Sequence, residues 1–132
     1  MPQRACAGPQ SFAATGPMPT VFVIGQDRQL RANVRAELRE QGVEALGMES
    51  LDDAAQAIAT GTIPAAVVFD AAGEAVPEPA LANLARRVPV ILVASRTTAA
   101  PSLEGIAAVL WRPVRVGEVV EQVKQVLKGQ AV

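Results

Sequence analysis

The chain lacks histidine and tyrosine, and its 132 residues include one cysteine, one Trp and three Phe. The absence of histidine removes the commonest general base, the histidine-dependent nucleophilic triads and most zinc sites. The single cysteine, Cys6, excludes an internal disulfide and a thiolate metal cluster. A single cysteine suits the reduced cytoplasm, where we expect this protein to be located. Since the sequence also offers no paired carboxylates, we expect that it is not an enzyme.

The sequence also lacks long runs of charged residues of one sign. The formal net charge is -1, and acidic and basic residues are mixed along the chain. No basic stripe indicates nucleic-acid binding, no apolar run reaches membrane-spanning length, and the N-terminus lacks the apolar core of a signal peptide. We therefore expect contact with neither nucleic acid nor a membrane.

What is present is an alternation of apolar runs and helical patterns. Residues 1–19 are rich in Pro, Gly, Ala, Gln and Ser without periodicity, which predicts a flexible N-terminal tail. From residue 20 to residue 129, five strand–helix pairs follow one another. This order predicts an α/β fold with a doubly wound five-stranded parallel sheet in a three-layer α/β/α arrangement, the (βα)5 flavodoxin-like architecture. The strands are expected at residues 20–24, 43–48, 65–69, 90–94 and 107–111.

The helices are predicted from their apolar stripes and their caps. Asp27 should cap the first helix, which Gly42 ends, and either Ser50 or Asp52 should cap the second. A short helix is expected near Pro101–Gly105, and the last should end before Gly129. The inner stripes are expected to be Leu30, Val34 and Leu38; Leu51, Ala54, Ala55 and Ile58; Leu81, Leu84, Ala85 and Val88; and Val116, Val119, Val120, Val123 and Leu127.

Asp70 is the candidate site residue. It directly follows the apolar run Ala65–Phe69, which has the pattern of a strand buried on both faces. A carboxylate at that point lies at the carboxyl end of the strand, where ligands collect in open parallel sheets.

Several further residues resemble one family. Pro64 precedes the run that ends in Asp70, Pro89 precedes the apolar run at 90–94, and Arg112 stands before Pro113. From Thr20 to about Lys128 the chain resembles the receiver (CheY-like) domain of two-component response regulators. The resemblance implies that Asp70 is the phosphoacceptor and that the partners are a histidine kinase or a downstream regulator. It also implies that the face of the fourth and fifth helices and the fifth strand mediates output or homodimerisation.

The metal side of the site departs from that family. Two acidic residues that bind Mg²⁺ in the family align here to Gly25 and Gln26, and Asp27 stands one position further on. Mg²⁺ requires oxygen ligands, and Asp70 would be the one certain carboxylate among them. No cofactor is therefore expected, and Mg²⁺ only if the site is still active. As a helix N-cap, Asp27 should point at its own helix.

The phosphoryl side departs as well. The family's Thr or Ser aligns to Ala94, with Ser95 next, and its lysine aligns to Arg112. Arg112 could form a permanent salt bridge with Asp70 or could hold a phosphoryl group as a bidentate donor. Ser95 could replace the missing hydroxyl if the strand end shifted by one residue, or could simply begin the loop.

These substitutions lead to three hypotheses. The first is a pseudo-receiver that acts by protein–protein contact, with Asp phosphorylation impaired or absent. The second is an active receiver that a histidine kinase phosphorylates on Asp70. The third is a small α/β domain that binds a nucleotide or another ligand, although neither GxGxxG nor GxxxxGK[ST] is present.

Overall fold

The computed structural model describes residues 18–71, 76–95 and 105–130. The tail expected over residues 1–19 lies outside this part of the chain up to residue 17, as does the short helix expected near 101–105 except for Gly105. The described elements are β1 (Thr20–Ile24), α1 (Arg28–Glu40), β2 (Glu44–Met48), α2 (Leu51–Ala59), β3 (Ala66–Asp70), α3 (Glu78–Ala85), β4 (Val90–Ala94), β5 (Ile106–Trp111) and α4 (Val116–Gln130).

The sheet is parallel throughout, with the strand order β2-β1-β3-β4-β5. This confirms the predicted doubly wound α/β fold and the central position of β1, β3 and β4. All five residues of β3 and all five of β4 are buried. Because the strands run in one direction, their carboxyl ends share one edge of the sheet, and Asp70 lies at the middle of that edge.

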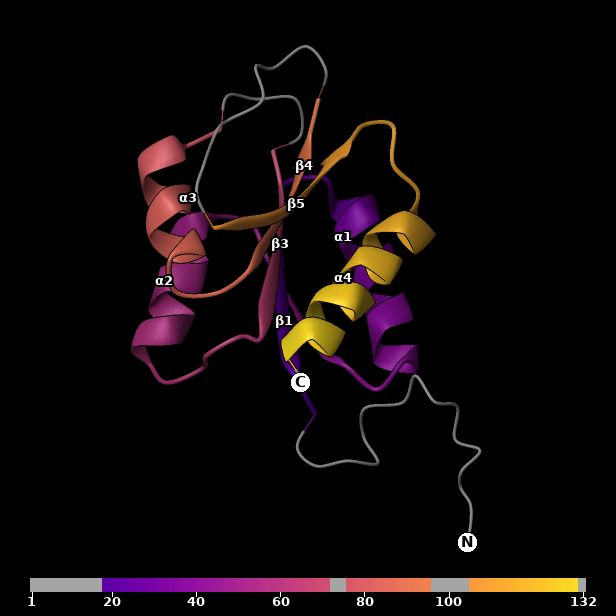
Figure 1. Cartoon of the computed structure of the whole chain (residues 1–132), viewed down its shortest axis with the longest axis horizontal. Coiled ribbons are helices and arrows are strands. Elements are labelled where there is room, and N and C mark those ends of the chain that lie inside the picture. Colours follow the sequence, from indigo (N-terminus) through magenta and orange to yellow (C-terminus); the bar gives the residue numbers. More distant parts are fainter. Residues whose placement is uncertain (1–17, 72–75, 96–104, 131–132) are drawn as a thin grey trace, which may run out of the picture.

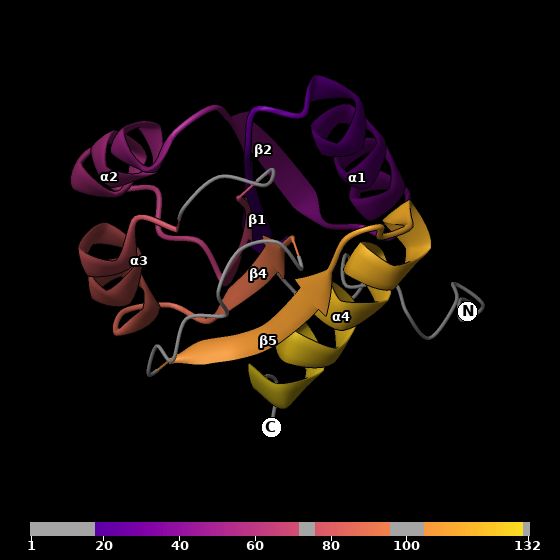
Figure 2. The same ribbon diagram turned by 90° about the horizontal axis from the view of Figure 1, so that it is seen from above.

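The helices form a layer on each face of the sheet. In Figure 2, α1 and α4 lie on one side of the sheet and α2 and α3 on the other, and Figure 1 shows the same arrangement from the side. Side chains alternate along each strand, so β1 sends Val21 and Val23 into one core and Phe22 and Ile24 into the other. None of the described helices is long and apolar enough to cross a membrane.

Most of the predicted caps are confirmed. Asp27 and Ser50 cap α1 and α2 by accepting hydrogen bonds from Leu30 N and Asp53 N, and Gly42 adopts the positive φ expected after α1. Ser50, not Asp52, is thus the cap of the second helix.

Three details of the predicted helices are wrong. Val88, expected in the inner stripe of the third helix, is buried but lies beyond α3, which ends at Ala85. Ala55 is exposed, because it lies about 100° around the helix from the buried residue Ala54. Gly129 lies inside α4 rather than beyond it, since Gly lowers helical propensity by only about 1 kcal/mol and does not by itself end a helix.

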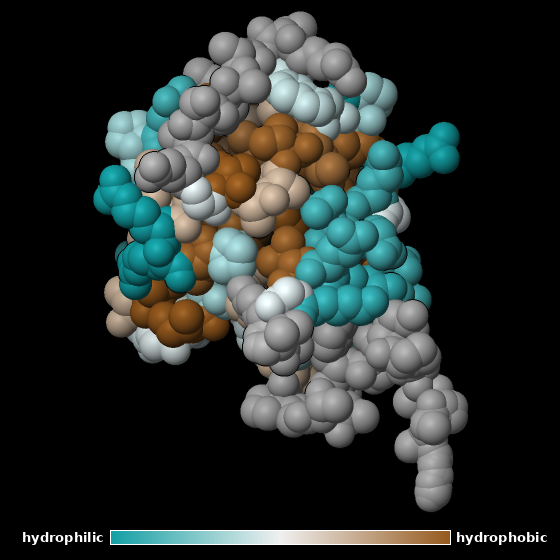
Figure 3. Space-filling view, viewed as in Figure 1, coloured by the Kyte–Doolittle hydropathy of each residue, from teal (hydrophilic) through white to brown (hydrophobic). Residues whose placement is uncertain are grey.

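The two edge strands are covered differently. On β2, Arg35 Nε donates a hydrogen bond to Ala45 O (3.3 Å), and the Arg35 side chain lies over Gly47. On β5, all six residues are apolar and none is fully buried. Figure 3 shows hydrophobic side chains gathered over β5, with the hydrophilic surface of α4 beside them.

Candidate functional site

Asp70 is the only buried polar or charged residue among those that the structure describes. Its side chain is 6% exposed. An ionised carboxylate in such surroundings is costly unless it is paired and hydrogen-bonded. The partner of Asp70 therefore decides what this site can do.

That partner is Arg112, the first residue after β5. Its backbone N donates to Ala94 O (2.8 Å), which holds it beside the end of β4, and its peptide bond to Pro113 is cis. Its Nε donates to Asp70 Oδ1 (3.2 Å), and its Nη2 donates to Asp70 Oδ2. The guanidinium thus donates to both carboxylate oxygens and forms a bidentate ion pair with Asp70. These hydrogen bonds raise the pKa of Arg112 above its usual value, so it stays charged.

Asp27 is the third member of the cluster. Its Oδ1 accepts a hydrogen bond from Leu30 N (3.1 Å), as the expected N-cap should. Its Oδ2 accepts one from Arg112 Nη2 (3.2 Å), which the sequence did not predict. The pKa of Asp27 is lowered, chiefly by the hydrogen bond from Leu30 N and further by Arg112.

Gly25 lies directly against Asp70. A Cβ atom at Gly25 would lie 2.9 Å from Asp70 Cβ, closer than real Cβ contacts allow. The Gly25 carbonyl accepts a hydrogen bond from Arg31 Nη1 (2.5 Å), and its N donates to Met48 O (3.0 Å). Glycine is therefore required here by close approach. The neighbouring Gln26 is exposed.

The residues present do not fit a Mg²⁺ ion of the family type. Mg²⁺ needs six oxygen ligands, usually with one or two carboxylates among them. Both oxygens of Asp70 and both of Asp27 accept N–H donors, and so does the Gly25 carbonyl. Within the described ranges, no three acidic, cysteine or histidine side chains come together.

The strand end opposite Asp70 carries no side-chain hydroxyl. β4 ends at Ala94, which is fully buried. Ser95 is half-buried and follows the strand. This placement favours the interpretation in which Ser95 begins the next segment rather than replacing the hydroxyl of the family.

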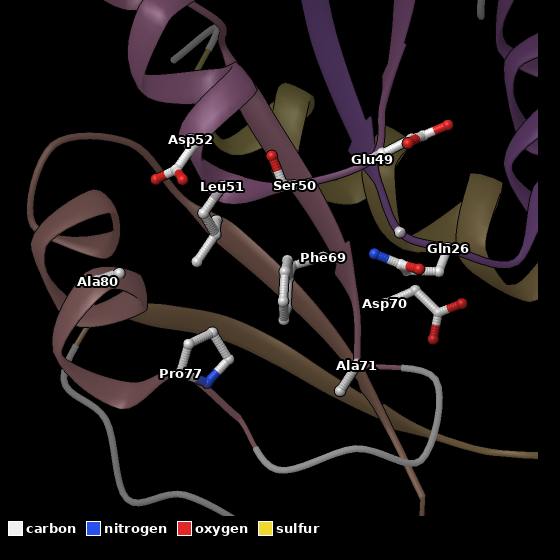
Figure 4. A pocket seen from close by; sticks show the side chains of 11 residues that line it. Gln26, Glu49, Ser50, Leu51, Asp52, Phe69, Asp70, Ala71, Pro77 and Ala80 are labelled. Carbon is white, nitrogen blue, oxygen red and sulfur yellow. The ribbon is translucent and has the colours of Figure 1, made fainter.

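A pocket of about 350 Å³ opens on the other side of Asp70, between the starts of α2 and α3. Figure 4 shows Leu51, Phe69, Pro77 and Ala80 around it, while the Asp70 carboxylate points away from them. The polar residues that line the pocket are Gln26, Glu49, Ser50, Asp52 and Asp70. The pocket and the Arg112 ion pair thus lie on different sides of one carboxylate.

No protein-family model matches this chain, and no curated protein matches it. Solved structures do match. A response regulator receiver protein from Burkholderia phymatum is 23% identical, with a TM-score of 0.61 over 83% of this chain and 95% of that one. The signal receiver domain of a putative LuxO repressor protein from Vibrio parahaemolyticus is 18% identical, with a TM-score of 0.71 over 87% and 94%.

A CheY-like receiver domain protein from Methanospirillum hungatei gives a TM-score of 0.68 at 18% identity, over 87% of this chain and 98% of that one. Such matches span nearly the full length of each known domain. The chain therefore has the fold of response regulator receiver domains, as the resemblance implied.

Proposed function

We propose that this chain is a receiver-like domain of two-component signalling that acts by protein–protein contact, with Asp phosphorylation impaired or absent. The observation that carries the proposal is the bidentate ion pair between Arg112 and the buried Asp70. Fold alone does not assign function, and the chemistry of this site therefore carries the proposal.

The physical reason lies in the charge that phosphorylation would add. To accept a phosphoryl group, an Asp70 oxygen must form a bond to phosphorus while the bond from phosphorus to the donor breaks, and several negative charges come together. A divalent cation normally stabilises that arrangement by several kcal/mol. Here both oxygens already accept Arg112 N–H groups, and the surrounding oxygens have N–H donors of their own. The barrier to phosphorylation should therefore be high.

The direct test is incubation of the protein with acetyl phosphate and Mg²⁺, followed by intact mass measurement. Beryllofluoride with amide NMR gives an independent readout. We expect no added phosphoryl mass and no shifts around Asp70. Clear modification that disappears in Asp70→Asn would overturn the proposal.

An active receiver is the second candidate, favoured by the retained Asp70 at the carboxyl end of a central strand. In that case the fork of Arg112 would release Asp70 and hold the phosphoryl oxygens. Phosphotransfer from a histidine kinase would then be slow but measurable. Arg112→Lys separates the candidates, because it should speed modification only if Arg112 obstructs the site.

The contact surface we propose is the face formed by β5 and α4. The six residues of β5 are apolar; Ala107 is exposed and the other five are half-buried. A partly exposed apolar strand at a sheet edge is a surface on which another chain can dock. The resemblance adds one more helix to this face, the short one expected near Pro101–Gly105. Except for Gly105, that segment lies outside the described residues. The partner would be a kinase, a downstream regulator or a second copy of the chain, in the cytoplasm.

A further inference from the structure

Two arginines of α1 lie over the outer edge of β2. This strand is at the end of the sheet, and Figure 2 shows it beside α1. A Cβ atom at Gly47 would lie 2.8 Å from Arg35 Cδ, 3.2 Å from Arg35 Nη1 and 3.3 Å from Arg31 Cδ. The lack of a side chain at Gly47 therefore allows both arginines to lie directly against the strand.

A backbone carbonyl holds each of the two guanidinium groups. Arg31 Nη1 donates to Gly25 O (2.5 Å), and Arg35 Nε donates to Ala45 O (3.3 Å). Within residues 18–71, 76–95 and 105–130, each group makes this one hydrogen bond. Because an arginine carries five N–H donors, most donors of both side chains are left for a ligand.

The two guanidinium groups also lack an acidic partner. In the described part of the chain, no carboxylate oxygen lies within 4.0 Å of Arg31 or Arg35, although both residues are half-buried. Positive charges that are partly removed from water are stabilised by an opposite charge, and two of them over one residue repel each other. This pair of arginines therefore favours an anion at the β2 edge.

The backbone N–H of Gly47 adds a further donor. Met48 O accepts a hydrogen bond from Gly25 N and so faces β1. Since backbone groups of successive residues in a strand point in opposite directions, Gly47 faces the free edge of the sheet. Ala45 faces the same way and accepts its hydrogen bond from Arg35 there. The Gly47 N–H thus points to the edge that Arg35 covers.

We propose that Arg31, Arg35 and the Gly47 N–H form an anion site that binds a phosphate group. Two guanidinium groups match the charge of a phosphate dianion, and each can donate to two phosphate oxygens at once. The contacts with Gly47 and the two carbonyls already order the arginine side chains, which lowers the cost of binding. The site goes beyond the proposed function and uses neither Asp70 nor Arg112.

The test is titration of the whole chain with inorganic phosphate, followed by the NMR signals of the backbone amides and the arginine Nε–H groups. NaCl of equal ionic strength and sodium acetate are the comparison salts. Arg35→Met removes one guanidinium. Arg39→Met is the matched control, because it removes the same charge from an exposed position one turn further along α1. Gly47→Ala keeps every charge but places a methyl group where Arg35 now lies.

We expect phosphate to give saturable shifts at Gly47, Arg31 and Arg35 in wild type. Arg35→Met should bind phosphate about tenfold more weakly or worse, the loss expected for a hydrogen bond to a charged group. Gly47→Ala should also bind more weakly, and Arg39→Met should bind as wild type does. If Arg35→Met does not fold, the comparison of wild type with Gly47→Ala decides.

Four results would overturn the proposal. They are the absence of saturable shifts in wild type, equal affinity for acetate, undiminished affinity in Gly47→Ala, and a loss in Arg39→Met as large as that in Arg35→Met. Shifts that centre on Asp70 and Arg112 instead of Gly47 would overturn it as well, because phosphate would then bind elsewhere.

The source of the phosphate group is tested with a short peptide that carries one phosphoserine and with the same peptide unphosphorylated. Tighter binding of the phosphopeptide than of inorganic phosphate supports the site with a phosphorylated partner protein as the source. Weaker binding of the phosphopeptide supports the site with free phosphate as the source. Equal binding of the two peptides would contradict recognition of a phosphate group.

Discussion

The Nη2 atom of Arg112 lies 3.2 Å from Oδ2 of Asp27, 85 residues earlier in the chain. Since the same atom also contacts Asp70, one side chain connects the start of α1, the end of β3 and the end of β5. One guanidinium therefore joins three elements at the charged edge of the sheet, and its removal should lower the stability of the protein.

Replacing Arg112 by methionine should destabilise the protein strongly. The change leaves the buried Asp70 without its ion-pair partner, and breaking a buried pair in this way costs about 3–5 kcal/mol, with the lower end expected because Arg112 is partly exposed. Urea unfolding followed by circular dichroism measures the difference. Arg112→Met/Asp70→Asn is the matched control and should recover much of the loss, since no charge is then stranded. Equal stability of the two variants would mean that the ion pair is not the cause.

A methyl group at Gly25 should destabilise the protein by about 1–3 kcal/mol, the usual cost of overpacking a core. The reason is the 2.9 Å approach of a Cβ atom to Asp70 Cβ. Gly117→Ala in α4 is the control, because nothing lies within 4 Å of its added Cβ, and it should be neutral or slightly stabilising. The free energies of unfolding of the two variants would contradict this picture if they changed equally.

Acid should weaken the fold partly through Asp27. The pKa of Asp27 is lowered in the folded protein, so its contribution is present above its unfolded pKa and is lost as the pH falls through the folded value. The free energy of unfolding should therefore fall below about pH 4. Asp27→Asn keeps an N-cap acceptor but cannot titrate, so its stability should fall less steeply over the same range. Parallel pH profiles for wild type and Asp27→Asn would remove Asp27 from this explanation.

A lysine at Ala107 should weaken association without unfolding the domain. Ala107 is the exposed residue of β5, so the substitution should change stability by less than about 0.5 kcal/mol. It should reduce self-association or partner binding through the β5 face, measured by sedimentation velocity or by titration with a partner kinase. Ala36→Lys, on the exposed surface of α1, is the control and should leave association unchanged. A loss of binding in both variants would point to charge rather than to the β5 face.

The strands and helices could be predicted because their signals are local. The runs that became β1, β3 and β4 are continuously apolar, and Asp27 and Ser50 precede clear helical stripes. The position of Asp70 followed from the end of one such run. Its pairing with Arg112 was one of two alternatives that the sequence left open, and the described contacts agree with the salt bridge.

Other parts of the site depend on distances between elements, which no local pattern records. The sequence presented Asp27 as an N-cap, and a helix N-cap gives no sign of what its second oxygen touches. Gly25 aligns to a position where the resembled family has an acidic residue. The lack of space there for any side chain depends on how closely β1 and β3 approach, which the sequence does not record. The exposure of β5 likewise depends on packing across the sheet edge.

The close contact between Gly25 and Asp70 also limits how this site could be re-engineered. An acidic side chain at residue 25 would first have to displace Asp70, the very residue it is meant to assist. Substitutions at the two positions are therefore not independent, and a library of single variants would score each of them as harmful. A metal-binding version of this site would therefore require simultaneous changes at residue 25, at Asp70 and at Arg112.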